Sequence, residues 1–140
     1  MEILIFRMKY PNDCTNNISA HQHFLCNISN DKIEVYTISS IVGKEKRVFN
    51  IKYKENYERI ESNEISKYGL TTPSFIDCTK RYDIGIDKTI NLNKLSKRTV
   101  PEDLKNRLLK RINDRIKDGS HKIYNIPLSD FVKYNPIIKI

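Results

Sequence analysis

The chain has 140 residues, a length that fits one domain and is sufficient to bury a core without disulfides or metals. Hydrophobic residues make up 39% of the sequence and charged residues 30%, which excludes a disordered chain, and no apolar run reaches membrane-spanning length. The net charge of +8 favours a polyanionic partner, most simply nucleic acid, although a composition rich in Lys, Asn and Ile produces the same balance without one.

The first segment, residues 3–10, alternates apolar and polar side chains and predicts a strand. Pro11, Asn12 and Asp13 are turn-forming residues that end it, and residues 14–20 predict a polar loop. A basic leader and a small-residue cleavage site are both missing here, so we expect a strand rather than a signal peptide.

A hairpin is expected next. Residues 21–28 and 32–40 have the composition of two strands, and the turn-forming residues 29–31 join them. Residues 48–54 predict a further strand.

The middle of the chain is less regular. Residues 55–69 are polar and end at Gly69, so they predict either a short helix or a long loop. Residues 74–79 form an apolar run suited to a buried strand, and residues 82–90 alternate as a strand does.

One amphipathic helix is predicted over about residues 99–118. Thr99 and Glu102 match a capping box, Pro101 suits the first turn, and Gly119 is a natural stop. Apolar residues recur on one face, at Leu104, Leu108, Leu109, Ile112 and Ile116. The opposite face is basic, and we expect solvation there rather than RNA contact.

The tail, residues 123–140, predicts a strand followed by a helical turn from Ser129. Five or six short strands followed by one amphipathic helix indicate a single mainly β (α+β) domain over residues 1–140. We expect a small β-barrel with a C-terminal amphipathic helix laid against it.

The three cysteines, Cys14, Cys26 and Cys78, are widely spaced and form no CxxC pair. This pattern argues against a disulfide framework or a zinc site and favours a reducing, cytoplasmic setting. We therefore expect no metal and no cofactor.

The hairpin and the residues after it carry the side chains that RNA cleavage without a metal requires. Histidine, with an ordinary pKa of about 6.5, suits proton transfer, hydroxyls bind phosphate, and cations stabilise its charge. We predict catalytic roles for His21, His23, Ser39 and Ser40. We predict RNA contacts for the cations and the aromatic residue of two segments, namely Lys44, Lys46, Arg47, Lys80, Arg81 and Tyr82.

Each of these residues also has a structural interpretation. His21 and His23 share one face of a strand with Leu25 and could simply pack there. The two serines could bond a local turn, residues 43–47 could be an exposed loop, and Tyr82 could begin a core strand.

Four segments together resemble the MazF/PemK toxins. They are His21-Gln22-His23-Phe24-Leu25, then Ile38-Ser39-Ser40, then the run from Gly69 to Asp77, and finally Leu95-Ser96-Lys97-Arg98 leading to Pro101-Glu102-Asp103-Leu104. The family has an Arg-Pro pair where this chain has histidines and a glutamine. We expect this departure to move that charged role onto His21, His23 and the Lys44–Arg47 cluster. The ToxN-type toxins, which are held by an RNA antitoxin, are a second neighbour.

The resemblance implies an SH3-like barrel that forms a homodimer and cuts single-stranded RNA without a metal. Attack by the 2'-hydroxyl leaves a 2',3'-cyclic phosphate, and an antitoxin, more often a protein than an RNA, neutralises the enzyme. We therefore expect a cytoplasmic toxin with endoribonuclease activity and no membrane partner. The alternative is a non-catalytic basic module on the same barrel that binds nucleic acid or protein.

Overall fold

The structure is a computed structural model that describes residues 2–11 and 18–140, and in that part of the chain it is mainly β. Cys14 and most of the predicted turn and loop before residue 18 lie outside the described residues. Eight strands are described: β1 (Glu2–Arg7), β2 (Ala20–Ile28), β3 (Lys32–Ser40), β4 (Tyr57–Ile60), β5 (Ser74–Asp77), β6 (Lys80–Gly85), β7 (Ser96–Thr99) and β8 (Lys122–Ile126). The helices of this part are α1 (Glu45–Val48), α2 (Glu102–Lys117) and α3 (Leu128–Tyr134), with short 3-10 turns η1 (Lys54–Asn56), η2 (Ile65–Tyr68), η3 (Leu92–Lys94) and η4 (Pro136–Ile138).

All eight strands belong to one sheet, with the order β4-β5-β3-β2-β1-β7 and with β6 and β8 attached through β3. The pairs are antiparallel except for β6 and β8, which run parallel. The predicted first strand and the β2–β3 hairpin are confirmed. The amide of Ser29 donates to the carbonyl of Lys32 at 2.9 Å across the hairpin turn.

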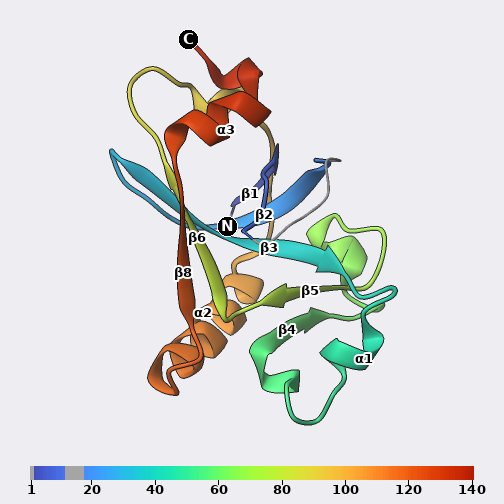
Figure 1. Ribbon diagram of the computed structural model, residues 1–140. Coiled ribbons are helices and arrows are strands. Elements are labelled where there is room, and N and C mark those ends of the chain that lie inside the picture. The colour runs from blue at the N-terminus through green and yellow to red at the C-terminus, as the bar shows by residue number, and fades with distance from the viewer. Residues whose placement is uncertain (1, 12–17) are drawn as a thin grey trace.

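The strand beside β3 is broken in two. β5 pairs Ile38 with Ile76, and β6 pairs Val35 with Tyr82, so only two residues of β3 face the five residues 77–81. The extra residues bend the chain into the corner between β5 and β6 (Figure 1). At that corner one edge of β3 lacks a ladder partner next to Thr37, and the sheet opens there.

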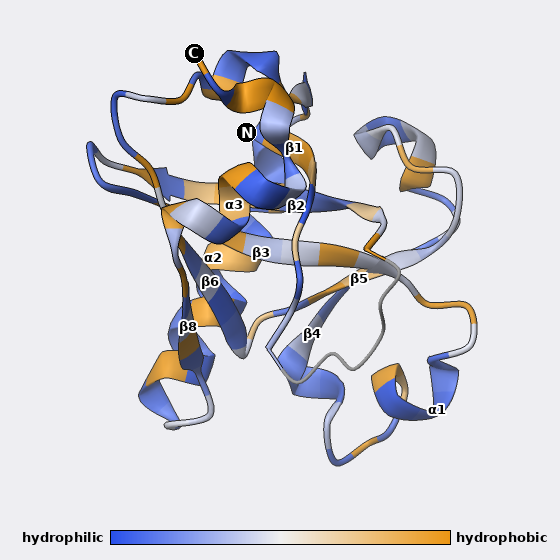
Figure 2. Ribbon diagram, turned by 45° about the horizontal axis from the view of Figure 1, so that its top comes forward, coloured by the Kyte–Doolittle hydropathy of each residue, from blue (hydrophilic) through white to orange (hydrophobic). Residues whose placement is uncertain are grey.

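The sheet is buried on both faces at its centre. Along β3, Ile33 and Val35 pack on one face beneath α3, whereas Tyr36 and Ile38 pack on the other face with α2. Hydrophobic and hydrophilic positions alternate accordingly along the strands and helices (Figure 2). The predicted helix stripe is confirmed at Leu104, Leu108 and Ile112, but Ile116, in the last turn of the helix, is 51% exposed.

The start of α2 differs from the prediction. Thr99 is the last residue of β7, and its backbone pairs with Glu2 of β1, so it does not cap the helix. Pro101 takes the N-cap position without a side-chain hydrogen bond. The end is as predicted, because Gly119 follows the C-cap with a positive φ of 79°. The helix is not C-terminal, because β8 and α3 follow it. These two elements match the strand and the helical turn predicted for residues 123–140.

Two segments after β3 were predicted wrongly. Residues 48–54 form no strand: Val48 is buried at the end of α1, and the apolar residues after it face solvent without a pairing strand. Residues 55–69 are neither one helix nor one loop, because they contain β4 between η1 and η2. Tyr57 and Ile60 are buried against β5, and such long-range pairing outweighs the polar local sequence.

The later strands are close to their predictions. The strand expected over 74–79 ends at Asp77, and the one expected over 82–90 is β6, which begins earlier and ends at Gly85. Within the described residues, no helix is long and apolar enough to span a membrane.

Candidate functional site

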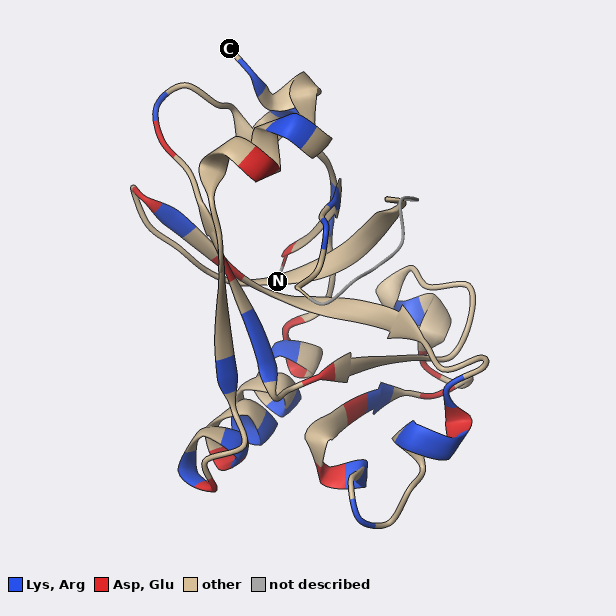
Figure 3. Ribbon diagram, in the orientation of Figure 1, with Lys and Arg blue, Asp and Glu red and all other residues tan. Residues whose placement is uncertain are grey.

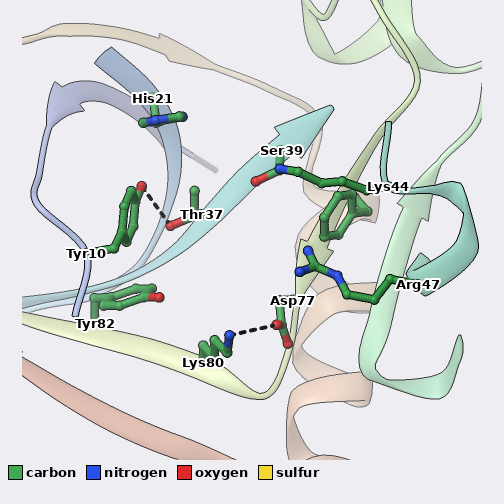
Figure 4. Close-up of a pocket in the computed structure, with 10 residues that line it drawn as sticks. Tyr10, His21, Thr37, Ser39, Lys44, Arg47, Asp77, Lys80 and Tyr82 are labelled. Atoms are coloured by element: carbon green, nitrogen blue, oxygen red, sulfur yellow. Dashed lines mark hydrogen bonds and ion pairs between the residues drawn. The ribbon is translucent and has the colours of Figure 1, made fainter. Parts of the chain in front are cut away.

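A cavity of about 290 Å³ opens where β5 and β6 part from β3. Its walls combine hydroxyls, aromatic rings and cations from five parts of the chain (Figure 4). The lining residues are Tyr10, His21, Thr37, Ser39, Lys44, Arg47, Phe75, Asp77, Lys80 and Tyr82. We call this cavity the β3 pocket.

Strand alternation explains how the hydroxyls reach the pocket. Thr37 and Ser39 are two residues apart on β3, so both side chains point to the same face, whereas Ser40 points to the other. The break between β5 and β6 leaves space in front of them. Ser40 instead accepts a hydrogen bond from the amide of Val42 at 3.2 Å, at the turn that leaves the strand.

The two histidines have different environments, although both lie on the same face of β2. His21 is partly exposed and lines the pocket, with its ring 5.6 Å from that of Tyr10. His23 is fully buried and its ring stacks on Phe6 at 3.9 Å. Burial, together with the charge on His21, lowers the pKa of His23 to about 3. His23 is therefore neutral at physiological pH and is withdrawn from the pocket.

A short hydrogen-bonded chain connects this buried ring to the pocket. The Tyr10 hydroxyl lies 2.7 Å from Nε2 of His23, and Thr37 donates its hydroxyl to the Tyr10 oxygen at 3.1 Å. Neutral His23 can accept the Tyr10 proton, which leaves the Tyr10 oxygen free to accept from Thr37.

Two cations, one from the N-cap of α1 and one from the helix itself, form one side of the pocket. Lys44 and Arg47 lie over the ring of Phe75, at 5.7 and 5.4 Å from its centroid, and Arg47 also lies 5.7 Å from the ring centroid of Tyr57. Partial burial, and then the neighbouring Arg47, lower the pKa of Lys44. Its ammonium is thus a better proton donor than that of an ordinary lysine.

The third cation comes from the corner between β5 and β6. Lys80 lies 4.0 Å from the carboxylate of Asp77. That carboxylate is held in place by Thr79, which donates its amide at 3.0 Å and its hydroxyl at 2.6 Å. Burial, followed by the charge of Asp77, raises the pKa of nearby Tyr82 to about 12, so its phenol remains a neutral donor.

The pocket brings together six of the ten residues predicted from sequence: His21, Ser39, Lys44, Arg47, Lys80 and Tyr82. The other four lie elsewhere. Lys46 is exposed on α1, and Arg81 bonds to Asp83 at 2.8 Å and pairs with Glu34 at 3.1 Å, outside the pocket. His23 and Ser40 have the positions described above.

Sequence reasoning missed three lining residues, Tyr10, Thr37 and Phe75, and it named Asp77 beside Lys80 without predicting a role for it. The sequence did contain a signal for Thr37, because it precedes Ser39 by two residues on the same predicted strand and therefore shares its face. Tyr10 and Phe75 had none, since their place in the pocket depends on strand pairing across distant parts of the chain. The described residues contain no group of three or more His, Cys, Asp or Glu side chains arranged to hold a metal ion.

No family model, no curated protein and no solved structure matches this chain.

Proposed function

We propose that this chain is a toxin-type endoribonuclease that cleaves single-stranded RNA without a metal, on an SH3-like barrel of the MazF/PemK kind. The observation that carries the proposal is the β3 pocket. It holds an imidazole, two hydroxyls and three cations within about 290 Å³, a volume suited to a phosphate and part of a nucleotide.

The reaction uses the 2'-hydroxyl of the RNA as nucleophile. His21 takes the proton of that hydroxyl, and the oxygen attacks the adjacent phosphorus. The bond from phosphorus to the 5'-oxygen breaks, and Lys44, with its lowered pKa, protonates the leaving oxygen. The products are a 2',3'-cyclic phosphate and a 5'-hydroxyl.

The other pocket residues hold the phosphate. Ser39 donates to a non-bridging oxygen, while Arg47 and Lys80 balance the charge that develops on the phosphorane-like transition state. Asp77 orients Lys80 through their ion pair. The rings of Phe75 and Tyr82 provide flat faces against which a base can stack.

The proposal includes a cytoplasmic homodimer that is neutralised by an antitoxin. A small acidic protein suits the net charge of +8, and an RNA antitoxin, as in ToxN-type systems, is the alternative. Co-expression with the product of the neighbouring reading frame is the direct test. Relief of growth arrest by that protein supports a protein antitoxin, and relief by a tandem-repeat RNA supports the alternative.

A second candidate function is a basic binding module on the same fold that does not cleave RNA. The burial of His23 favours it, because His21 is then the one imidazole lining the pocket. The cleavage experiment below separates the two functions.

The experiment pairs each pocket residue with a control of the same type outside the pocket. RNA ends are mapped after induced expression of the wild type, His21→Ala and Ser39→Ala, with His121→Ala and Ser40→Ala as controls. We expect growth arrest and cyclic-phosphate ends in the wild type and in both controls, and strongly reduced cleavage in the pocket variants. Intact RNA in wild-type cells at high expression would contradict the enzyme proposal.

A further inference from the structure

The segment that follows β3 exposes several large apolar side chains. Phe49 is 46% exposed and Tyr53 42%, and the aliphatic Val42 and Ile51 are 69% and 83% exposed. These residues follow one another around α1 and the turns after it, beside the pocket wall formed by Lys44 and Arg47. Four exposed apolar side chains in one short segment make this segment a candidate contact surface.

The same segment is strongly basic. Residues 42–54 contain five cations, namely Lys44, Lys46, Arg47, Lys52 and Lys54, against one carboxylate, Glu45 (Figure 3). None of these five cations forms a salt bridge with a described residue, because all the salt bridges in the described part of the chain involve other lysines and arginines. The charge of this segment is therefore available to an anionic ligand.

The two exposed rings each carry a cation nearby. The guanidinium of Arg59 lies 4.8 Å from the ring centroid of Phe49, and the ammonium of Lys52 lies 5.3 Å from that of Tyr53. Both residues remain more than 40% exposed although a cation lies over each ring. Exposed rings interleaved with cations are the pattern by which proteins bind single-stranded nucleic acid, since rings stack on bases and cations neutralise phosphates.

We propose that Lys46, Phe49, Lys52, Tyr53 and Lys54, here called the α1 surface, bind the nucleotides that flank the phosphate held in the β3 pocket. This inference rests on the proposed function, because it makes the α1 surface an extension of that site. Lys44 and Arg47 connect the β3 pocket to the α1 surface, because they lie at α1 and also line the pocket. A second copy of the chain is a poor occupant because its own α1 surface has the same charge.

Binding, rather than cleavage, is the appropriate measurement. The probe is a fluorescent 12-nucleotide single-stranded RNA with 2'-O-methyl groups, which lacks the nucleophile and stays intact. We expect Phe49→Leu and Tyr53→Leu each to weaken binding about tenfold, because the aromatic face is lost while apolar bulk is kept. Ile51→Ala, the matched control, removes a more exposed apolar side chain and is expected to change binding less than twofold.

A duplex of the same sequence provides the second control. Its bases are stacked on one another and are not accessible to Phe49 or Tyr53, so the leucine variants should bind it like the wild type. Equal losses for single strand and duplex would show that the surface responds to charge alone, and would overturn the inference. Unchanged single-strand binding in both leucine variants would overturn it as well.

A base-free polyanion tests the competing occupant, an acidic protein segment. Polyglutamate that binds as tightly as the RNA, with the same dependence on Phe49, would assign the α1 surface to a protein and overturn the inference. Failure of the proposed function is distinguishable from these results. If the protein binds single strands through Phe49 but does not cleave RNA, the inference about the α1 surface stands and the proposal of endoribonuclease activity fails.

Discussion

The two basic helical regions of this protein use their charge in opposite ways. On α2, Arg107 and Arg111 both bond to Glu58, at 2.8 and 2.6 Å, and Arg107 also bonds to Glu64 at 2.7 Å. Around α1 no such partners exist among the described residues, and Lys44, Arg47 and Lys52 lie over aromatic rings instead. Charge that is already neutralised stabilises the fold, whereas charge that is left available can bind a ligand. Net charge alone does not distinguish the two regions.

The largest expected effect is on catalysis. Lys44→Gln removes the proposed proton donor and one of the pocket cations, so we expect the cleavage rate to fall by about 10²–10³-fold. The matched variant on the other helix, Lys110→Gln, is expected to cleave like the wild type. Rates are measured on a short RNA with the purified protein. Equal losses in both variants would mean that the two regions do not differ in function.

The second prediction reverses the comparison by removing the partner that neutralises α2. Glu58 is buried and accepts a hydrogen bond from each arginine, so Glu58→Gln removes its negative charge and leaves one amide oxygen where two carboxylate oxygens accepted. We expect the free energy of unfolding to fall by about 2–3 kcal/mol, measured in urea. Glu45→Gln on α1 is the control and should leave the urea midpoint unchanged. RNA affinity should be the same in the Glu58 variant and the wild type.

The third prediction concerns a buried group outside both helical regions, His23 of β2. Its pKa is about 3 in the folded state, below the ordinary value of about 6.5. At pH 5 the unfolded chain therefore takes up a proton that the folded chain does not. Stability is fully present above about pH 6.5 and falls by about 1.4 kcal/mol for each pH unit below it, until the folded pKa is reached.

The variant His23→Gln keeps an acceptor for Tyr10 but does not titrate. We expect its stability to depend less on pH between 6.5 and 4.5 than that of the wild type, as measured by thermal melting. His121→Gln is the comparison: partial burial also lowers the pKa of His121, and we expect a smaller flattening there. Parallel melting curves for wild type and His23→Gln would contradict the assigned burial of the imidazole.

Local sequence predicted the elements whose signal is local. The β2–β3 hairpin and the buried residues of α2 follow from alternation, turn residues and a four-residue spacing. β4 and β7 were missed because they are short and polar, and they form only by pairing with distant strands. The same cause explains the wrong capping box, since Thr99 pairs with Glu2 of β1.

The site could be predicted only in part, for a related reason. Strand period places His21 and His23 on one face, but their depth depends on Phe6 and Tyr10, which belong to another segment of the chain. The sequence predicted solvation for the cations of α2 and RNA contact for those around α1, but it could not show that carboxylates neutralise cations of α2. For Arg107 those carboxylates lie 43 or more residues away along the chain.

The fourth prediction has the smallest effect per residue. It compares the cations around α1 with those of α2 directly, through the salt dependence of RNA binding. Each phosphate contact on a single strand contributes about 0.7 to the slope of log affinity against log salt. Neutralising Lys46, Lys52 and Lys54 to Gln should therefore lower the slope by about 2 for the 2'-O-methyl RNA. The same number of charges removed from α2, at Lys105, Lys110 and Lys117, should leave the slope unchanged, because the single strand does not reach that helix. A similar decrease in both triple variants would show that the RNA responds to net charge, and the distinction between paired and available cations would lose its functional meaning.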